Sequence, residues 1–142
     1  MKTLQRESQR PIPQAKKRIQ AILREMRIIL DGGCVLRAFP ETGQCGPRTI
    51  NGNLILQFDH LLTRERNIAW NVELGVCVCL RHHLYYKKQY PAKYEECVRK
   101  AIGEKRCKLL DRAREDRRTY HMDLNNWLLL EIALTQDLAK IK

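Results

Sequence analysis

Apolar residues recur at helical spacing near the start of the chain, and they predict an N-terminal helix. Lysine and arginine side chains are left for the opposite, solvent-facing side of that helix. Asp31-Gly32-Gly33 ends the pattern, because glycine is a common helix terminator. Residues 1–13 are polar and include two prolines, which predicts an extended basic arm. We therefore expect a helix over residues 14–31, with an apolar stripe made of Ile19, Ile22, Leu23, Met26 and Ile29 or Leu30.

The central part of the chain changes to short apolar runs, which are typical of β-strands. Leu54 to Phe58 and Leu74 to Val78 are two such runs. Residues 34–53 hold Gly, Pro and Asn and predict a loop or a distorted hairpin, and residues 61–71 are polar and irregular. Residues 80–90 contain no helix breaker and predict a short helix. The expected order in this part of the chain is strand, strand, helix.

The C-terminal part returns to helical patterns. Pro91 suits the first turn of a helix, Gly103 weakens that helix in its middle, and residues 105–117 continue in helical style. Asp123 is a candidate N-cap for a last helix, whose apolar stripe comprises Leu124, Trp127, Leu128, Leu134, Leu138 and Ile141. These patterns predict an α+β fold, with a small core over residues 32–90, the N-terminal helix before it, and two or three helices in an extension over residues 91–142.

Length and composition exclude several classes of protein. With 142 residues the chain fits one compact domain. It has no run of about 20 apolar residues, so we expect no membrane-spanning helix, and its N-terminus lacks the apolar segment of a secretory signal. Both observations predict a cytoplasmic protein. The six cysteines are then expected to be metal ligands or buried thiols rather than disulfides.

The net charge of +11 predicts an attraction to polyanions. The positive excess lies in residues 1–27 and 81–118, and it brackets a nearly neutral centre. That layout is expected if the flanks hold a phosphate backbone while the centre does something local. The alternative is that the basic helices simply present solvated faces.

Four cysteine and histidine residues have the pattern of a structural zinc site. Cys79-x-x-His82 has the two-residue gap that lets both side chains bind one ion, and Cys34 with Cys45 can supply the other pair. Cys77 is a rival for Cys79, and the alternative for the whole set is buried reduced thiols. For the two remaining cysteines, Cys97 and Cys107, we expect packing roles.

Three of the four histidines lie close to these cysteines. His60 follows Asp59 at the end of a predicted strand, and His83 follows a candidate zinc ligand, whereas His121 stands alone and is expected to be structural or solvated. A carboxylate and one imidazole can hold a divalent cation beside a second imidazole that acts as a base. Those are the parts required for metal-assisted phosphodiester hydrolysis. Strand alternation places Asp59 and His60 on opposite faces, so both reach one site only if the strand ends or bulges there.

The order of these motifs resembles that of the HNH, or ββα-metal, nuclease superfamily. The matching residues are Asp59-His60, then Asn71, then Cys79-Leu80-Arg81-His82-His83, with Cys34 and Cys45 ahead of them. The zinc-type cysteines are similar to those of zinc-braced phage and prophage members, and the overall plan is most similar to NinG-like recombination proteins. The resemblance covers roughly residues 34–90.

The resemblance implies a fold, a reaction and a role for each matched residue. It implies a ββα-metal core with a zinc knuckle made by Cys34, Cys45, Cys79 and His82. His60 matches the general base, Asn71 the residue that orients the base or its loop, and Asp59 and His83 the ligands of a catalytic Mg²⁺ or Mn²⁺ ion. The implied substrate is DNA and the implied setting is a bacterial host cell, with phage or host recombination proteins as possible partners.

Several basic residues are candidate phosphate contacts beside this site, although generic solvated charge is an equal alternative. They are Arg64, Arg66, Lys87 and Lys88 near the motifs, and Lys16, Lys17 and Arg18 in the N-terminal helix.

Two other functions compete with a metal-dependent DNA endonuclease. One is a zinc-stabilised DNA-binding or recombination accessory protein without catalysis, which has no need for Asp59, His60 and His83 to converge. The other is a helical interaction protein, with a homodimer formed through the apolar stripe around Trp127.

Overall fold

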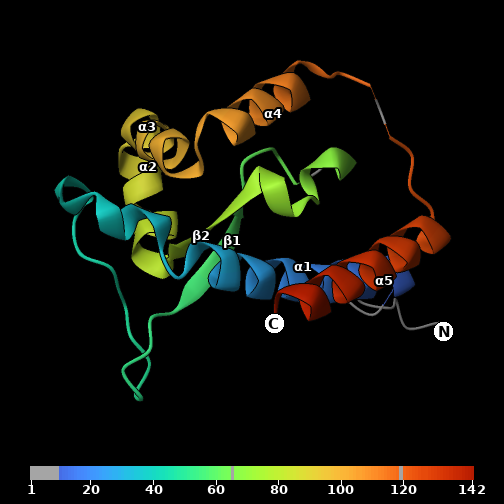
Figure 1. Cartoon of the computed structure of the whole chain (residues 1–142), viewed down its shortest axis with the longest axis horizontal. Helices are drawn as coiled ribbons and strands as arrows, with labels where there is room; N and C mark the ends of the chain where they lie inside the picture. The colour runs from blue at the N-terminus through green and yellow to red at the C-terminus, as the bar shows by residue number, and fades with distance from the viewer. Residues whose placement is uncertain (1–9, 65, 119) are drawn as a thin grey trace, which may run out of the picture.

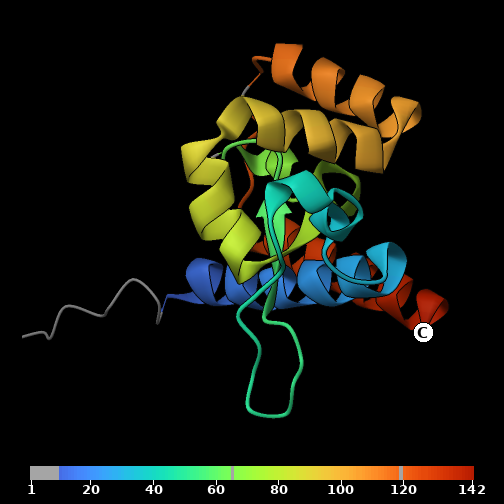
Figure 2. The same cartoon turned by 90° about the vertical axis from the view of Figure 1, so that its left-hand side faces the viewer.

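Two pairs of helices lie on opposite sides of a β-hairpin (Figures 1 and 2). The structure is a computed structural model that describes residues 10–64, 66–118 and 120–142. Within these residues the fold is a mixed α+β fold with one two-stranded antiparallel sheet, which confirms the predicted class. Of the predicted basic arm, residues 1–9 lie outside the described residues.

Helix α1 (Pro11–Asp31) begins earlier than the sequence pattern predicts. Residues 11–13 were expected in the extended arm, and the structure corrects this because proline in a first helical turn sacrifices no intrahelical hydrogen bond. The helix ends as expected at Gly32, whose left-handed backbone (φ 71°) lets its N–H reach Ile28 O.

The strands β1 (Leu56–His60) and β2 (Gly75–Cys79) pair from Leu56 opposite Cys79 to His60 opposite Gly75. Both strands lie slightly later than the predicted apolar runs, and Leu54, predicted to start the first strand, pairs instead with Arg48 across the preceding loop. Gly75 is required in this register, since a Cβ there would lie 2.0 Å from Cζ of Phe58.

The loop before β1 holds two short 3-10 turns, Val35–Ala38 and Pro40–Thr42, and then a segment that projects from the body of the molecule (Figure 2). The connection between the strands, predicted to be irregular, likewise contains 3-10 turns at Asn67–Ala69 and Val72–Leu74.

A continuous helical segment follows β2, as predicted. It contains a π-helical turn over His82–Tyr86 and then the short helix α2 (Lys87–Gln89). Helices α3 (Pro91–Ile102) and α4 (Glu104–Glu115) come next, and Gly103 separates them. The expectation that Gly103 only weakens one helix was wrong, because its φ of 85° is incompatible with a continuing helix.

Helix α5 (Leu124–Ile141) carries the predicted cap. Asp123 Oδ1 accepts a hydrogen bond from Asn126 N at 2.9 Å, and Asn126 Oδ1 accepts one from Asp123 N at 3.1 Å. The helix runs beside α1 in the same direction, with ion pairs Arg18–Glu131 and Glu25–Lys142 joining the two (Figure 1). Its stripe is therefore buried largely within the chain itself, through Trp127, Leu134 and Leu138.

Two apolar clusters flank the hairpin. One joins α1, α5 and the connection between the strands, and the other joins β2, α3 and the loop at residues 34–36. The open end of β1, with Asp59 and His60, lies where the helices of the two sides approach it. No described helix is long and apolar enough to cross a membrane.

Candidate functional site

Three cysteines and a histidine converge at the end of β2. The ligand atoms of Cys34, Cys45, Cys79 and His82, called here the Cys3His group, all lie within 4.8 Å of one another. His82 Nδ1 lies 3.6 Å from the sulfur of Cys34, 3.7 Å from that of Cys45 and 3.0 Å from that of Cys79. A tetrahedral zinc ion with ligands at about 2.0–2.3 Å separates its sulfur and nitrogen ligands by about 3.6 Å. The Cys3His group can therefore hold a zinc ion.

Three separate segments supply this group. Cys34 precedes a 3-10 turn, Cys45 lies in the projecting loop, and Cys79 and His82 lie at the junction of β2 and its helix. Cys77, the rival candidate, lies outside the group, with its backbone N–H donating to Asp31 Oδ2. Cys97 and Cys107 are also outside it, buried in α3 and half-buried in α4. Among the described residues this is the one set of three or more Cys, His, Asp or Glu donors close enough to share an ion.

Thr42 fixes the tautomer of His82. Its Oγ1 donates to Phe39 O at 2.7 Å and accepts from His82 Nε2 at 2.9 Å, which leaves the Nδ1 lone pair for the three sulfurs. Burial lowers the pKa of His82 and so favours the neutral ring that a metal requires. Such a hydrogen bond behind a metal ligand raises affinity by holding the ring in place.

Replacing Thr42 with valine tests this support. Valine keeps the volume but cannot accept from His82 Nε2, so we expect zinc affinity to fall by about 10- to 100-fold. Competition with a chromophoric chelator measures the change. The exposed Thr135→Val substitution on α5 is the matched control, and equal zinc affinity in both variants would contradict a supporting role for Thr42.

The three thiols of the Cys3His group can all lose their protons only if a cation neutralises the resulting thiolates. Burial, reinforced by the neighbouring sulfurs, raises the pKa of Cys45 to about 12 and also raises that of Cys34. Adjacent thiolates in a buried place repel one another unless a metal ion neutralises them. The chemistry of this donor set therefore suits a metal ion.

A second cluster surrounds Asp59, whose side chain is almost fully buried. Tyr94 Oη donates to Oδ2 at 2.6 Å, and Lys87 Nζ donates to Oδ1 and Oδ2 at 2.9 and 3.0 Å. His83 Nε2 lies 3.3 Å from Oδ1. Burial alone would raise the pKa of Asp59, but the interactions with His83, Lys87 and Tyr94 outweigh it and lower that pKa. Asp59 is thus held as a carboxylate.

The two donor atoms of Asp59 and His83 suit a divalent ion. His83 Nδ1 contacts Gln57 Oε1 on one side of the ring, and Nε2 faces Asp59 Oδ1 at 3.3 Å on the other. Without a metal ion a proton on Nε2 completes this contact, and a divalent ion between the two atoms would replace that proton. Neighbouring ligands of an octahedral Mg²⁺ ion at about 2.1 Å lie about 3 Å apart, which is close to this separation.

His60 lies on the other side of β1, held by the loop and by α1. Its Nδ1 donates to Ala69 O at 3.0 Å, and its Nε2 lies 2.6 Å from Gln20 Oε1. The ring packs edge-on against Phe58 and Trp70 with centroids 4.9 Å away. Burial, helped by the charge of Arg64, lowers the pKa of His60 and keeps its ring neutral near pH 7.

Strand alternation holds, yet Asp59 and His60 border one groove. The groove is about 920 Å³ in volume and is lined by both residues together with His83, Lys87 and Arg64. The groove reaches both faces because β1 ends at His60, so the carboxylate borders it from the α3 side and the imidazole from the α1 side. Asp59, His60 and His83 therefore line one groove, and within it Asp59 and His83 are in contact.

A basic hollow continues the groove along α1. It is about 430 Å³ in volume, and its lining includes Lys16, Lys17 and Arg64 but no acidic residue. Gln20 and Arg64 border both the hollow and the groove. Lys16 also stacks on Trp127, with Nζ 4.9 Å from the ring centroid. The hollow thus carries a row of positive charge away from His60.

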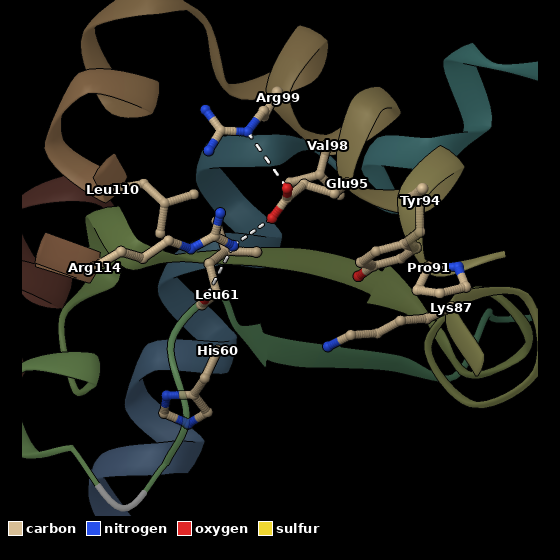
Figure 3. A pocket seen from close by; sticks show the side chains of 11 residues that line it. His60, Leu61, Lys87, Pro91, Tyr94, Glu95, Val98, Arg99, Leu110 and Arg114 are labelled. Carbon is tan, nitrogen blue, oxygen red and sulfur yellow. Dashed lines mark hydrogen bonds and ion pairs between the residues drawn. The ribbon is translucent and has the colours of Figure 1, made fainter. Parts of the chain in front are cut away.

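A side pocket lies between α3, α4 and the end of β1, with Lys87 and Tyr94 in its lining (Figure 3). It is about 380 Å³ in volume and shares His60, Leu61 and Lys87 with the groove. Its arginines are already paired, since Glu95 contacts both Arg99 and Arg114 (Figure 3). We assign it no ligand.

Other residues singled out by sequence lie away from the groove. Asn71 Oδ1 accepts from Glu73 N and caps a 3-10 turn, so Asn71 shapes the loop rather than touching His60. Arg66 donates to Asp116 O, and Arg18 pairs with Glu131 at 2.8 Å. Lys88 is exposed on α2, and His121 is exposed before α5.

Sequence reasoning missed three contacts of the site residues. Gln20 and Thr42 carry no motif, and Tyr94 was assigned only to the apolar side of its helix. Their roles arise from contacts between segments far apart in the chain, which no local spacing reveals.

No protein-family model matches the chain, and neither a curated protein nor a solved structure shows detectable similarity to it.

Proposed function

We propose that this protein is a metal-dependent DNA endonuclease of the HNH type. The observation that carries the proposal is the convergence of Asp59, His60 and His83 on one groove whose neighbouring hollow is lined by lysine and arginine. A carboxylate held ionised, an imidazole held neutral and a second imidazole aimed at the carboxylate are the parts of metal-assisted hydrolysis.

His60 supplies the general base. With Nδ1 donating to Ala69 O, the neutral ring keeps an acceptor at Nε2 that can take a proton from an attacking water. Gln20 Oε1 now lies at that position and can only accept, so the Gln20 carboxamide must turn or leave before a neutral Nε2 can accept a proton from water. The contacts with Phe58 and Trp70 keep the ring in place during this exchange.

Asp59 and His83 would hold Mg²⁺ or Mn²⁺. When bound, the ion supplies stabilisation for the charge that develops on the phosphate and on the leaving oxygen. Tyr94 orients the carboxylate through its 2.6 Å hydrogen bond, and Gln57 orients the His83 ring from behind.

A zinc ion in the Cys3His group would brace this arrangement. His82 and His83 are consecutive in the π-helical turn, one in the zinc group and the other at Asp59. Fixing His82 therefore also fixes the start of the helix that presents His83 and Lys87.

The basic hollow gives the DNA a path. Lys17, Gln20 and Arg24 recur at helical spacing along α1 and border the hollow or the groove. A phosphate backbone lying over this face would reach His60 from the side of Lys16 and Lys17. A bacterial cytoplasmic location, phage or host recombination partners and a homodimer remain predictions from the sequence.

Cleavage of supercoiled plasmid and branched DNA tests the proposal. We expect the zinc-loaded protein to cut in Mg²⁺ or Mn²⁺, leaving a 5′-phosphate and a 3′-hydroxyl, and to lose that activity when the free divalent ion is removed. Asp59→Asn should lower the rate in both metals. A rate that does not depend on the divalent ion or on Asp59 would refute the metal-dependent mechanism.

The pH dependence of cleavage follows from the pKa of His60. Its folded-state pKa is lowered below the usual 6.5, so the base stays neutral and active until the pH falls below that value. We therefore expect the acid limb of kcat/KM to lie below pH 6.5. Arg64→Gln should move the limb towards higher pH, because the positive charge of Arg64 helps to lower this pKa. A limb above pH 6.5 in the wild-type protein would exclude His60 as the titrating base.

A further inference from the structure

Lys87 forms an ion pair with the carboxylate of Asp59, which is a ligand of the proposed metal ion. Its Nζ lies 2.9 Å from Oδ1 and 3.0 Å from Oδ2 of Asp59, so it contacts both oxygens. It stands one helical turn after His83, and residues at this spacing share one face of a helix. The two side chains therefore approach Asp59 together, with His83 Nε2 3.3 Å from the same Oδ1.

A divalent ion and the ammonium group of Lys87 cannot both interact fully with the carboxylate of Asp59. An ion between Asp59 Oδ1 and His83 Nε2 would lie within a few ångströms of Nζ, where like charges repel strongly in a partly buried site. Lys87 is free to leave, because its side chain is 39% exposed and its stem is flexible. His83 and Tyr94 stay with the carboxylate when it does.

We propose that Lys87 is an exchangeable cation that couples metal loading to DNA binding. Without a divalent ion it neutralises Asp59, and when the ion arrives it swings into the groove that it already lines and binds a phosphate of the DNA. The inference rests on the proposed function, since it takes the groove as the DNA site and Asp59 as a metal ligand.

The exchange predicts a reciprocal effect. If the ion releases Lys87 for DNA, metal-loaded protein binds DNA more tightly, and DNA-bound protein must bind the ion more tightly by the same factor. Lys87 then pairs with Asp59 in the metal-free protein and with a DNA phosphate in the metal-loaded protein. The metal-free protein therefore binds DNA with one cation fewer beside the scissile bond.

The experiment measures metal and DNA affinity without cleavage. Zinc-loaded protein carrying His60→Ala is titrated with Mn²⁺, followed by electron paramagnetic resonance, and separately with a fluorescent duplex with and without Mn²⁺. Lys87→Met is compared with Lys88→Met, a matched change at the exposed neighbour on the same short helix. Asp59→Asn identifies the Mn²⁺ that binds at the groove.

We expect Lys87→Met to raise Mn²⁺ affinity of the free protein by about tenfold, because a competitor is removed. We also expect it to reduce, by a similar factor, the gain in DNA affinity that Mn²⁺ produces, while Lys88→Met leaves both quantities near those of the parent. Unchanged or weaker Mn²⁺ binding in Lys87→Met would overturn the exchange while leaving the proposed function intact. Mn²⁺ binding that is insensitive to Asp59→Asn would overturn both.

Discussion

Cys79→Ser is expected to lose zinc and to unfold the central part of the chain under conditions where the wild-type protein is stable. Cys34, Cys79 and His82 have no exposed surface, and the apolar cluster of β2 and α3 is built around them. A structural zinc site contributes about 10 kcal/mol or more to folding in small zinc domains, which is comparable with the whole stability of a domain of this size. Elemental analysis and thermal melting monitored by circular dichroism measure the two effects.

Cys107→Ser is the matched control for that variant. Cys107 is half-buried in α4 and lies outside the Cys3His group, so this change should keep the zinc and shift the melting temperature by only a few degrees, about the effect of a single mild substitution. Freshly purified, reduced wild-type protein without zinc would contradict a structural metal. Equal melting of Cys79→Ser and Cys107→Ser would contradict it as well.

His60→Ala is expected to lower the rate of DNA cleavage by about 10²- to 10⁴-fold, the usual contribution of a positioned general base. We expect this loss because His60 has two properties that no other described imidazole in the groove combines. Burial lowers its pKa, and its Nδ1 donates to a backbone carbonyl. His83 cannot replace it, since its ring is aimed at Asp59.

The control for His60→Ala separates chemistry from folding. The ring fills space between Phe58 and Trp70, so alanine leaves a gap and should also lower stability modestly, by about 1–3 kcal/mol. His60→Gln fills more of that space but cannot act as a base, and it should be as inactive as His60→Ala while melting closer to wild type. A glutamine variant that cleaves DNA at the wild-type rate would exclude proton transfer by His60.

The helices were largely predictable because their signals are local. The apolar stripe and the Gly32 terminator located α1, and Asp123 located the start of α5. The first strand was predicted two residues early and the second one residue early, because an apolar run does not set the register, which depends on pairing across the sheet. Gly103 was predicted only to weaken one helix, but it separates α3 from α4. Its positive φ depends on how these two helices pack, which the local sequence does not indicate.

The site residues that could be predicted are those whose spacing along the sequence brings their side chains together. The two-residue gap between Cys79 and His82 located half of the Cys3His group, although only the folded chain distinguishes Cys79 from Cys77. The contacts of Asp59 with Lys87 and Tyr94, and of His60 with Gln20, join distant segments. Lys87 was predicted as a candidate phosphate contact, and its pairing with the carboxylate of Asp59 is a further contact that no local spacing indicates.

Strand cleavage by zinc-loaded wild-type and His60→Ala proteins, compared on one plasmid in Mg²⁺ and in Mn²⁺, tests the central claim most directly. Matched zinc content, and an assay temperature well below the melting temperature of both proteins, ensure that only the proposed base differs. We predict that the wild-type protein converts supercoiled plasmid to cut forms while the variant leaves it intact. Equal cutting by both proteins, or no cutting by either in any divalent metal, would contradict a nuclease that uses His60 in this groove.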